Sequence, residues 1–253
     1  MARVLYLLYG VVVYILFVGT FLYAVGFVEN THIRLAGDLY LVPKSIDFGG
    51  PYSHWAVALL IDLGLLALFA VQHSVMARKR FKEVWTRVVP PPIERSTYVL
   101  FASLCLIVLF TFWRPMIHVL WAVENPVLIR VIQGISLLGF AIALVATFLI
   151  NHPDLFGLRQ VVLHLRGEQP AAPGFRTPGF YKFVRHPIYL GFTLAFWAAP
   201  VMTTGHLLFA GAMLGYTLLA IRYEERDLVR DHGDDYLQYR RRVGMLLPLK
   251  RGR

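Results

Sequence analysis

Five long apolar blocks constrain this sequence more than any other feature. A helix that crosses a bilayer needs about 20 predominantly apolar residues, and the blocks cover residues 4–28, 55–76, 96–113, 127–150 and 187–221. The composition agrees, because 57% of the residues are hydrophobic and 16% are charged, whereas soluble domains have roughly 45–50% apolar and about 25% charged residues. The sequence therefore predicts an all-α, polytopic integral membrane protein.

The last block is too long for one ordinary span. Its middle reads Thr203-Thr204-Gly205-His206, a run of residues typical of turns, so we expect a C-terminal helical hairpin and five to six transmembrane helices in all. The first block exceeds the 7–15 apolar residues of a signal peptide and is not followed by a convincing cleavage site. We expect it to remain as the first span.

The basic residues predict the orientation of these spans. The formal net charge is +10, and segments 1–3, 77–95, 151–186 and 222–253 hold 21 of the 25 Lys and Arg residues. Basic residues concentrate in cytoplasmic loops, so both termini are expected to be cytoplasmic, in the cytoplasmic (inner) membrane of a bacterium. The charge then reflects topology and contact with anionic membrane lipid, and no nucleic-acid-binding motif accompanies it.

Metal chemistry has little support in the sequence. Cys105 is the single cysteine, which permits neither an internal disulfide nor a cysteine-based zinc site. The histidines show no spacing typical of metal ligands, so no metal is expected.

A polar constellation brackets the predicted hairpin. It contains Tyr181, Arg185, His186, Pro187, Tyr189 and Gly191 before the hairpin, and Glu224, Glu225, Gly233, Tyr236 and Tyr239 after it. Each half of the hairpin has about 17 residues, or roughly 26 Å of helix, so His186 and Glu224 are expected to meet at one membrane surface. Taken singly, Lys182, Arg185 and Tyr189 are equally typical of interface anchors, and the two glutamates of a solvated helix start.

As an ordered set, these residues resemble the isoprenylcysteine carboxyl methyltransferase superfamily of integral membrane methyltransferases. The motifs that carry the resemblance are Arg185-His186-Pro187-Ile188-Tyr189-Leu190-Gly191, then Glu224-Glu225, then Gly233-Asp234-Asp235-Tyr236-Leu237-Gln238-Tyr239. The resemblance implies S-adenosyl-L-methionine bound near the cytoplasmic interface. It also implies two regions, four N-terminal transmembrane helices at 1–150 and a membrane methyltransferase catalytic module at 151–253. The cofactor-binding residues it implies are Tyr181, Arg185, His186, Pro187, Tyr189, Gly191, Glu224 and Glu225.

The chemistry of this cofactor suits those side chains. A carboxylate fits its ammonium, ribose hydroxyls or sulfonium, while Arg185 or the His186 backbone fits its carboxylate. Adjacent helical residues point about 100° apart, so Glu224 and Glu225 are not expected to do the same job. They remain unranked.

The N-terminal part narrows the resemblance to the bacterial methanethiol S-methyltransferase branch. It rests on segments that include Gln72-His73-Ser74, Glu94-Arg95-Ser96-Thr97-Tyr98 and Asp154-Leu155-Phe156-Gly157-Leu158-Arg159. This branch implies methylation of methanethiol to dimethyl sulfide. It also implies substrate contacts from Gln72, Ser74, Phe156 and Arg159.

Asp62 and His73 form a second constellation inside the second block. They are 11 residues apart, three helical turns, and so share a helix face. Ionisable groups inside a bilayer are costly and point to function, which makes His73 the first candidate for a base, with Asp62 or Asp154 acting through water as the second. A base is unnecessary if the thiolate present at ambient pH suffices, and both residues are also typical of structural polar contacts.

Other functions stay open at this level. The acceptor is alternatively a different thiol, or a lipid-like molecule such as a prenylcysteine or lipid amine. NnrU-like membrane proteins share parts of the pattern, which allows a non-enzymatic accessory role. A channel or transporter would favour inverted repeats or paired broken helices, and none is visible in the sequence. The sequence does not predict an oligomeric state.

Overall fold

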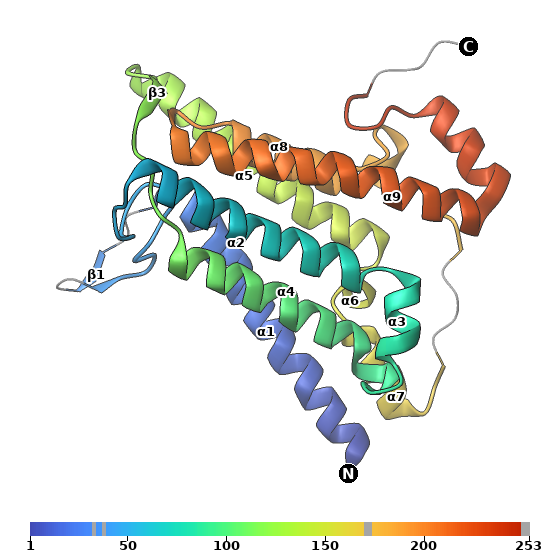
Figure 1. The fold of residues 1–253 in the computed structure, drawn as a ribbon. Coiled ribbons are helices and arrows are strands. Elements are labelled where there is room, and N and C mark those ends of the chain that lie inside the picture. The colour runs from blue at the N-terminus through green and yellow to red at the C-terminus, as the bar shows by residue number, and fades with distance from the viewer. Residues whose placement is uncertain (32–33, 37–38, 170–173, 249–253) are drawn as a thin grey trace. The chain divides into compact units, whose positions relative to one another are not determined.

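The computed structural model describes residues 1–31, 34–36, 39–169 and 174–248, which are mostly helical (Figure 1). Among these residues, five helices are long and apolar enough to cross a membrane: α1 (Ala2–Val28), α2 (Trp55–Met76), α4 (Pro91–Phe112), α5 (Pro126–Ile150) and α9 (Thr204–Arg242). The predicted fold class, a helical polytopic membrane protein, is confirmed. Parts of the predicted cytoplasmic segments 151–186 and 222–253 lie outside the described residues.

Shorter elements connect the long helices. The helical ones are α3 (Lys79–Trp85), α6 (His152–Leu155), α7 (Leu158–Arg166), the 3-10 helix η1 (Gly179–Lys182) and α8 (Pro187–Trp197). Strands β1 (Arg34–Ala36) and β2 (Leu39–Tyr40) pair antiparallel, and β3 (Val119–Ala122) pairs with β4 (Val201–Thr203) in a second two-stranded sheet.

The described residues form two compact units, and each is considered by itself. The first contains α1 to α4, α7 and residues 203–206; the second contains α5, η1, α8 and most of α9. The units are therefore interleaved along the chain, and the division of the sequence at residue 150 stays a prediction.

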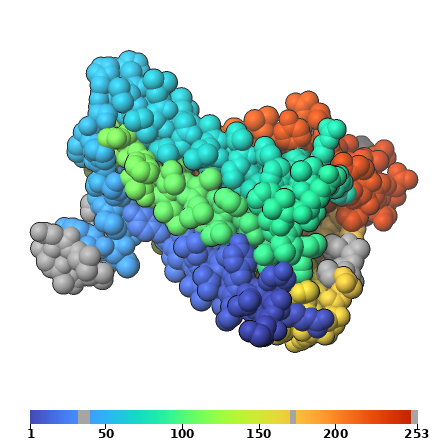
Figure 2. Space-filling view, turned by 60° about the horizontal axis from the view of Figure 1, so that its bottom comes forward, coloured from blue at the N-terminus to red at the C-terminus, as the bar shows by residue number. Residues whose placement is uncertain are grey.

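In the first unit, α4 packs on both α1 and α2, and α7 packs on α1 and α4. Figure 2 shows α4 lying between the other two long helices on the face in view. Gly157 starts α7 with φ of 85°, and a Cβ there would lie 2.6 Å from the backbone nitrogen of Ser96. The close approach of α7 to the start of α4 therefore depends on the absence of a side chain at this position.

In the second unit, α8 packs closely along α5. Gly139 and Gly191 face each other in this contact, because a Cβ at either position would lie 2.5 Å from the carbonyl oxygen of the other. Paired small residues allow helix backbones to approach in this way in membrane proteins. The hydroxyl of Ser136 adds an interhelical hydrogen bond of 2.8 Å to the carbonyl of Ala195.

The predicted position of the hairpin turn is wrong by several residues. Helix α8 ends at Trp197 and α9 begins at Thr204, so the chain reverses over residues 198–203. The Thr203 hydroxyl accepts the backbone N–H of His206 at 3.0 Å, which is the bond of a helix N-cap. Thr204, Gly205 and His206 thus form the first turn of α9, because turn-forming residues are also the residues that start helices.

Helix α8 is also shorter than the predicted half of a hairpin. Its 11 residues rise about 16 Å at 1.5 Å per residue, whereas the hydrocarbon core of a bilayer is about 30 Å thick. Helix α9, in contrast, has 39 residues and runs from an apolar start into a polar C-terminal part.

Candidate functional site

The chain enters α8 through a short extended segment that is fixed on both sides. Val184 pairs with Gly244 in an isolated parallel bridge. The backbone N–H of Arg185 donates to the carbonyl of Gly244 at 2.9 Å, and that of His186 donates to the carbonyl of Met245 at 3.2 Å. These bonds hold the two side chains at the N-terminus of α8, where Pro187 occupies the first turn with a backbone already suited to a helix.

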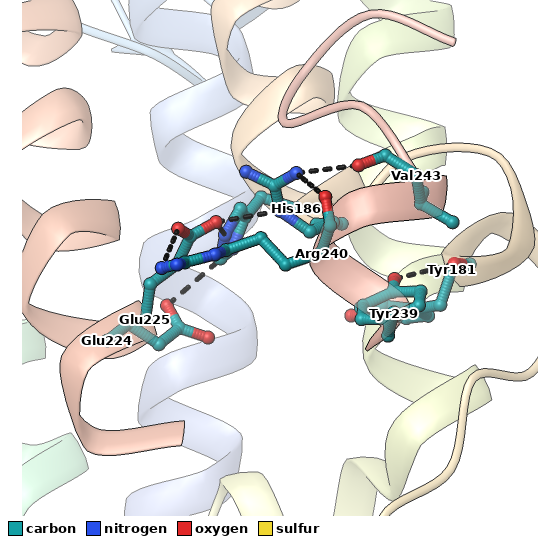
Figure 3. A network of polar contacts seen from close by, with 8 residues as sticks. Tyr181, His186, Glu224, Glu225, Tyr239, Arg240 and Val243 are labelled. Atoms are coloured by element: carbon teal, nitrogen blue, oxygen red, sulfur yellow. Dashed lines mark hydrogen bonds and ion pairs between the residues drawn. The ribbon is translucent and has the colours of Figure 1, made fainter. Parts of the chain in front are cut away.

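The Arg185 guanidinium joins three parts of the second unit. Its Nε donates to Oε1 of Glu225 at 2.7 Å, and its Nη1 donates to the carbonyls of Arg240 at 3.1 Å and Val243 at 2.6 Å (Figure 3). Those carbonyls lie at the C-terminus of α9, where helical carbonyls lack partners in the helix itself. Because its side chain is only 4% exposed, Arg185 serves as an internal anchor of this helix end.

The two adjacent glutamates of α9 lie in different environments. Oε1 of Glu225 is 3.2 Å from Nε2 of His186, and Oε2 of Glu224 is 4.0 Å from Nδ1 of the same ring (Figure 3). The prediction that His186 and Glu224 meet is confirmed. The Glu225 side chain is 14% exposed and that of Glu224 is 46% exposed.

These contacts distinguish the roles of the two carboxylates. A carboxylate accepts hydrogen bonds and does not donate them, so Nε2 of His186 carries the proton that Glu225 accepts. Glu225 is therefore committed to Arg185 and His186. Glu224 keeps oxygen atoms that a ligand can reach, a difference that the sequence left undecided.

A break in α9 builds the aromatic side of the cluster. Gly233 has φ of 53° and ψ of −126°, a backbone conformation that side-chain-bearing residues rarely adopt, and the helix changes direction there (Figure 1). Beyond it, the Tyr239 hydroxyl donates to the carbonyl of Tyr181 at 2.6 Å (Figure 3). The ring of Phe175 lies 5.9 Å from that of Tyr236 and 5.5 Å from that of Tyr239.

Two tyrosine hydroxyls in this cluster are of chemical interest. The buried Tyr236 hydroxyl lies close to the Glu225 carboxylate and makes no hydrogen bond of ordinary geometry with the described residues. Burial, with Glu224 and Tyr239 nearby, raises the pKa of Tyr181 well above its ordinary value, so this phenol stays protonated at neutral pH. Tyr236, Tyr239 and Arg240 were not predicted as site residues, although the Gly-x-x-Tyr-x-x-Tyr spacing marked the two tyrosines.

The remaining predicted cofactor residues lie along α8. The ring of Tyr189 is 5.8 Å from that of His186, which places it beside the cluster. Pro187 is buried at the start of the helix. Gly191 faces the backbone of α5, so the structure gives it a packing contact.

The predicted catalytic residues of α2 belong to the first unit. Oδ1 of buried Asp62 accepts the backbone N–H of Arg114 at 2.9 Å, which secures the chain that leaves α4. The ring of His73 lies between aromatic neighbours, 5.2 Å from the ring of Phe69 and 5.0 Å from that of Tyr98. The backbone carbonyl of His73 accepts a hydrogen bond from the Tyr98 hydroxyl at 3.3 Å.

The predicted substrate contacts also lie in the first unit. Nε2 of Gln72 donates to Sδ of Met76 at 3.2 Å, and the Ser74 carbonyl accepts Nε of Arg78 at 3.2 Å. Near α7, Asp154 and Arg159 form an ion pair of 2.7 Å, and Phe156 stacks on Phe17 with ring centroids 4.0 Å apart. Roles in catalysis or substrate binding stay predictions for these residues.

A metal centre is not visible in the described part of the chain, where no group of three or more His, Cys, Asp and Glu side chains is placed to hold an ion.

The fold and the cluster together define a class: a helical integral membrane protein with an Arg-His-Glu-Glu cluster where a short helix and a long helix meet.

Comparison with known proteins identifies the family. Residues 54–243 match the family described as "Protein of unknown function (DUF1295)". Methanethiol S-methyltransferase 1 of Bradyrhizobium diazoefficiens is 54% identical over 96% of this chain and 82% of its own length. Methanethiol S-methyltransferases of Crocosphaera subtropica and Mycobacterium tuberculosis are 50% and 49% identical, over 98% of this chain and 93% and 98% of theirs.

The chain belongs to the DUF1295 family and is a relative of these methanethiol S-methyltransferases. No solved structure matches it.

Proposed function

We propose that this protein transfers a methyl group from S-adenosyl-L-methionine to methanethiol and releases dimethyl sulfide. The observation that carries the proposal is the cluster of Arg185, His186, Glu224 and Glu225, which two segments of the second unit build together. The names of relatives that match nearly the whole chain support the same acceptor.

The residues of the cluster fit this methyl donor. Glu224 has a half-exposed carboxylate beside Nδ1 of His186, suited to an ammonium or to ribose hydroxyls. The Tyr236 hydroxyl is buried without a hydrogen bond of ordinary geometry to the described residues, and buried polar groups normally have a partner. Arg240, 41% exposed and 3.9 Å from Glu225, is the cation we assign to the donor carboxylate.

Arg185 and Glu225 hold the site in shape and do not contact the donor in this proposal. Arg185 and the His186 backbone, expected from the sequence to bind the donor carboxylate, are bonded to the protein itself. In this proposal Arg185 and Glu225 are positioning residues, which fix His186 and the end of α9.

The transfer balances with few groups. When bound, the donor supplies an electrophilic methyl group on a positively charged sulfur. The acceptor thiol loses its proton. Its sulfur then forms a new S–C bond with the methyl group, in line with the bond between that methyl group and the donor sulfur, which breaks. The donor leaves as a neutral thioether. The protein aligns the reacting atoms and excludes water from the thiolate. Methanethiol is small and apolar enough to arrive through the bilayer.

The location follows from the same charge pattern. We propose that the protein lies in the cytoplasmic membrane with both termini inside, since residues 77–95, which follow α2, and the C-terminal part of α9 are rich in Lys and Arg. S-adenosyl-L-methionine is a charged cytoplasmic metabolite, so it can reach the cluster only if the cluster faces the cytoplasm.

Headspace gas chromatography tests the proposal. Membranes that contain the protein are supplied with S-adenosyl-L-methionine and methanethiol, beside membranes with Glu225→Gln and Asp227→Asn. Both variants exchange an acidic side chain of α9 for an amide, but Asp227 is 38% exposed and forms a surface ion pair with Arg230. We expect dimethyl sulfide from the wild type and from Asp227→Asn, and at least a tenfold loss for Glu225→Gln.

Each outcome has a defined meaning. Absence of dimethyl sulfide from folded wild-type protein would refute the proposed reaction. Full activity of Glu225→Gln would refute the positioning role of Glu225 in this cluster. Replacement of methanethiol by longer thiols and a prenylcysteine in the same assay tests the alternative acceptors.

A further inference from the structure

Tyr236 is a fully buried side chain of the second unit. It follows the break at Gly233 in α9 and is only 1% exposed. Its ring centroid lies 5.9 Å from that of Phe175 and 5.9 Å from that of Tyr239. These rings hold the Tyr236 ring on two sides, so its hydroxyl has a defined position.

The Tyr236 hydroxyl lies beside the Arg-His-Glu-Glu cluster. It is close to Glu225, and the charges of Glu224 and Arg185 also act on it. Nevertheless, it makes no hydrogen bond of ordinary geometry with the described residues. Since a buried polar group normally has a partner, this hydroxyl is placed to receive one from a ligand bound at the cluster.

The neighbouring carboxylate determines which side of the hydroxyl faces that ligand. A phenol has an ordinary pKa of about 10, so the hydroxyl keeps its hydrogen at neutral pH. A carboxylate attracts this hydrogen and repels the phenolic oxygen, so the hydrogen turns toward Glu225. The lone pairs of the oxygen then point away from Glu225, where they suit a positive group.

S-adenosyl-L-methionine has two positive groups of different chemistry. Its ammonium donates hydrogen bonds, which the half-exposed carboxylate of Glu224 is suited to accept. Its sulfonium has no N–H or O–H to donate, so a protein recognises it through charge and through dipoles. A dipole acts more strongly in a buried site, where the effective dielectric constant is low. The buried Tyr236 oxygen therefore matches the sulfonium better than the ammonium.

We propose that the Tyr236 hydroxyl oxygen contacts the sulfonium of S-adenosyl-L-methionine and makes the site prefer this charged donor to its neutral product, S-adenosyl-L-homocysteine. This inference rests on the proposed function. When the methyl group has left, the sulfur no longer carries a positive charge, and its attraction to the oxygen is lost. Tyr236 is thus a specificity-determining residue, which favours the exchange of product for fresh donor.

Two other roles of the hydroxyl make different predictions. A hydroxyl that only holds Glu225 in place would stabilise the protein in the absence of any ligand. A hydroxyl that binds a part common to donor and product, such as the ribose, would affect the affinity for both equally. The ligand-free stability and the two affinities therefore separate the three roles.

The first measurement is the Tm of purified, ligand-free Tyr236→Phe in detergent, with Tyr239→Phe as the matched control. Both variants keep the ring and lose one hydroxyl, but the Tyr239 hydroxyl donates to the carbonyl of Tyr181 at 2.6 Å (Figure 3). Loss of one partner of a buried hydrogen bond is destabilising, so Tyr239→Phe should have a lower Tm. Tyr236→Phe should equal or exceed the wild type, because its hydroxyl lacks such a bond.

The second measurement is the Kd of each protein by isothermal titration calorimetry. The ligands are S-adenosyl-L-methionine, S-adenosyl-L-homocysteine and sinefungin, an analogue with a protonated amine in place of the methylated sulfonium. Loss of a contact to a charged group weakens binding by about tenfold to a hundredfold. Tyr236→Phe should lose that factor for the two charged ligands and bind S-adenosyl-L-homocysteine as the wild type does. Tyr239→Phe should change all three Kd values by one common factor.

The outcomes distinguish this inference from the function beneath it. The role of Tyr236 is overturned by a lower ligand-free Tm of Tyr236→Phe, by an unchanged Kd for S-adenosyl-L-methionine, or by equal changes for donor and product. The proposed function still stands in those cases if the wild type forms dimethyl sulfide. A wild type that shows the Tyr236-dependent preference but forms no dimethyl sulfide overturns the proposed reaction and supports the role of Tyr236. A wild type that does not bind S-adenosyl-L-methionine overturns both.

Discussion

The contact between Gly139 and Gly191 allows a test that separates packing from ligand binding. Motif resemblance predicts a cofactor role for Gly191, whereas the structure places its Cα against the backbone of α5. In Gly191→Ala the new Cβ would lie 2.5 Å from the Gly139 carbonyl oxygen and 2.6 Å from the Ala143 nitrogen, where ordinary contacts are 3.4–4 Å. Because both atoms belong to a helix backbone, the two helices must separate.

The magnitude follows from two opposing effects. Overpacking costs about 1–3 kcal/mol, and the upper end applies because no flexible side chain can move aside. Replacement of a helical glycine by alanine returns about 1 kcal/mol. The net destabilisation is about 2 kcal/mol, or roughly 4–8 °C in Tm for a chain of this size.

The assay is thermal unfolding of the purified protein in detergent, followed by tryptophan fluorescence without any ligand. Gly134→Ala is the matched control, because Gly134 lies on α5, the helix against which Gly191 packs, and a Cβ there meets nothing within 4 Å. The Tm of this variant should equal or exceed that of the wild type. An unchanged Tm for Gly191→Ala, with donor binding lost, would refute the packing argument and favour the ligand role.

Two other substitutions test the backbone and the buried carboxylate. Gly233→Ala forces a side chain into a conformation with φ of 53°, which should destabilise the protein by about 1–3 kcal/mol. A Cβ at Gly211, on the same helix, meets nothing within 4 Å, so Gly211→Ala should leave Tm unchanged or raised. Equal effects of the two variants on Tm would contradict the role of the break at Gly233. Asp62→Leu removes the acceptor for the Arg114 N–H and should cost about 1–3 kcal/mol in the same melting assay. Asp62→Asn keeps an acceptor oxygen and should retain both stability and dimethyl sulfide formation, so an inactive but stable Asp62→Asn would restore this residue as a catalytic candidate.

Parts of the site were predictable because they depend on order along the chain. The motif Arg185-His186 ends one segment and Glu224-Glu225 begins another, and the apolar stretch between them had to return to the surface it left. The contacts between the His186 ring and the two glutamates in the structure agree with this expectation. The sequence did not separate the two glutamates, because the difference lies in the direction each side chain takes from α9.

Other features depended on distant parts of the chain. The carbonyls that bind the Arg185 guanidinium come from Arg240 and Val243, more than 50 residues away. The turn between α8 and α9 was misplaced because threonine and glycine are typical of turns and of helix starts alike, and the Thr203 hydroxyl acts as the cap.

By itself the sequence determined that the chain is a helical membrane protein, which residues can span the bilayer, and which motif residues gather at the hairpin. These properties follow from the transfer free energy of apolar side chains and from the obligation of a backbone in lipid to satisfy its own hydrogen bonds. Only the tertiary structure decided that Arg185 and Glu225 hold the site together while Glu224 stays accessible, and that Gly191 packs against α5. Those roles depend on directions and distances of a few ångströms, which arise when separate helices pack and which no pattern along the chain records.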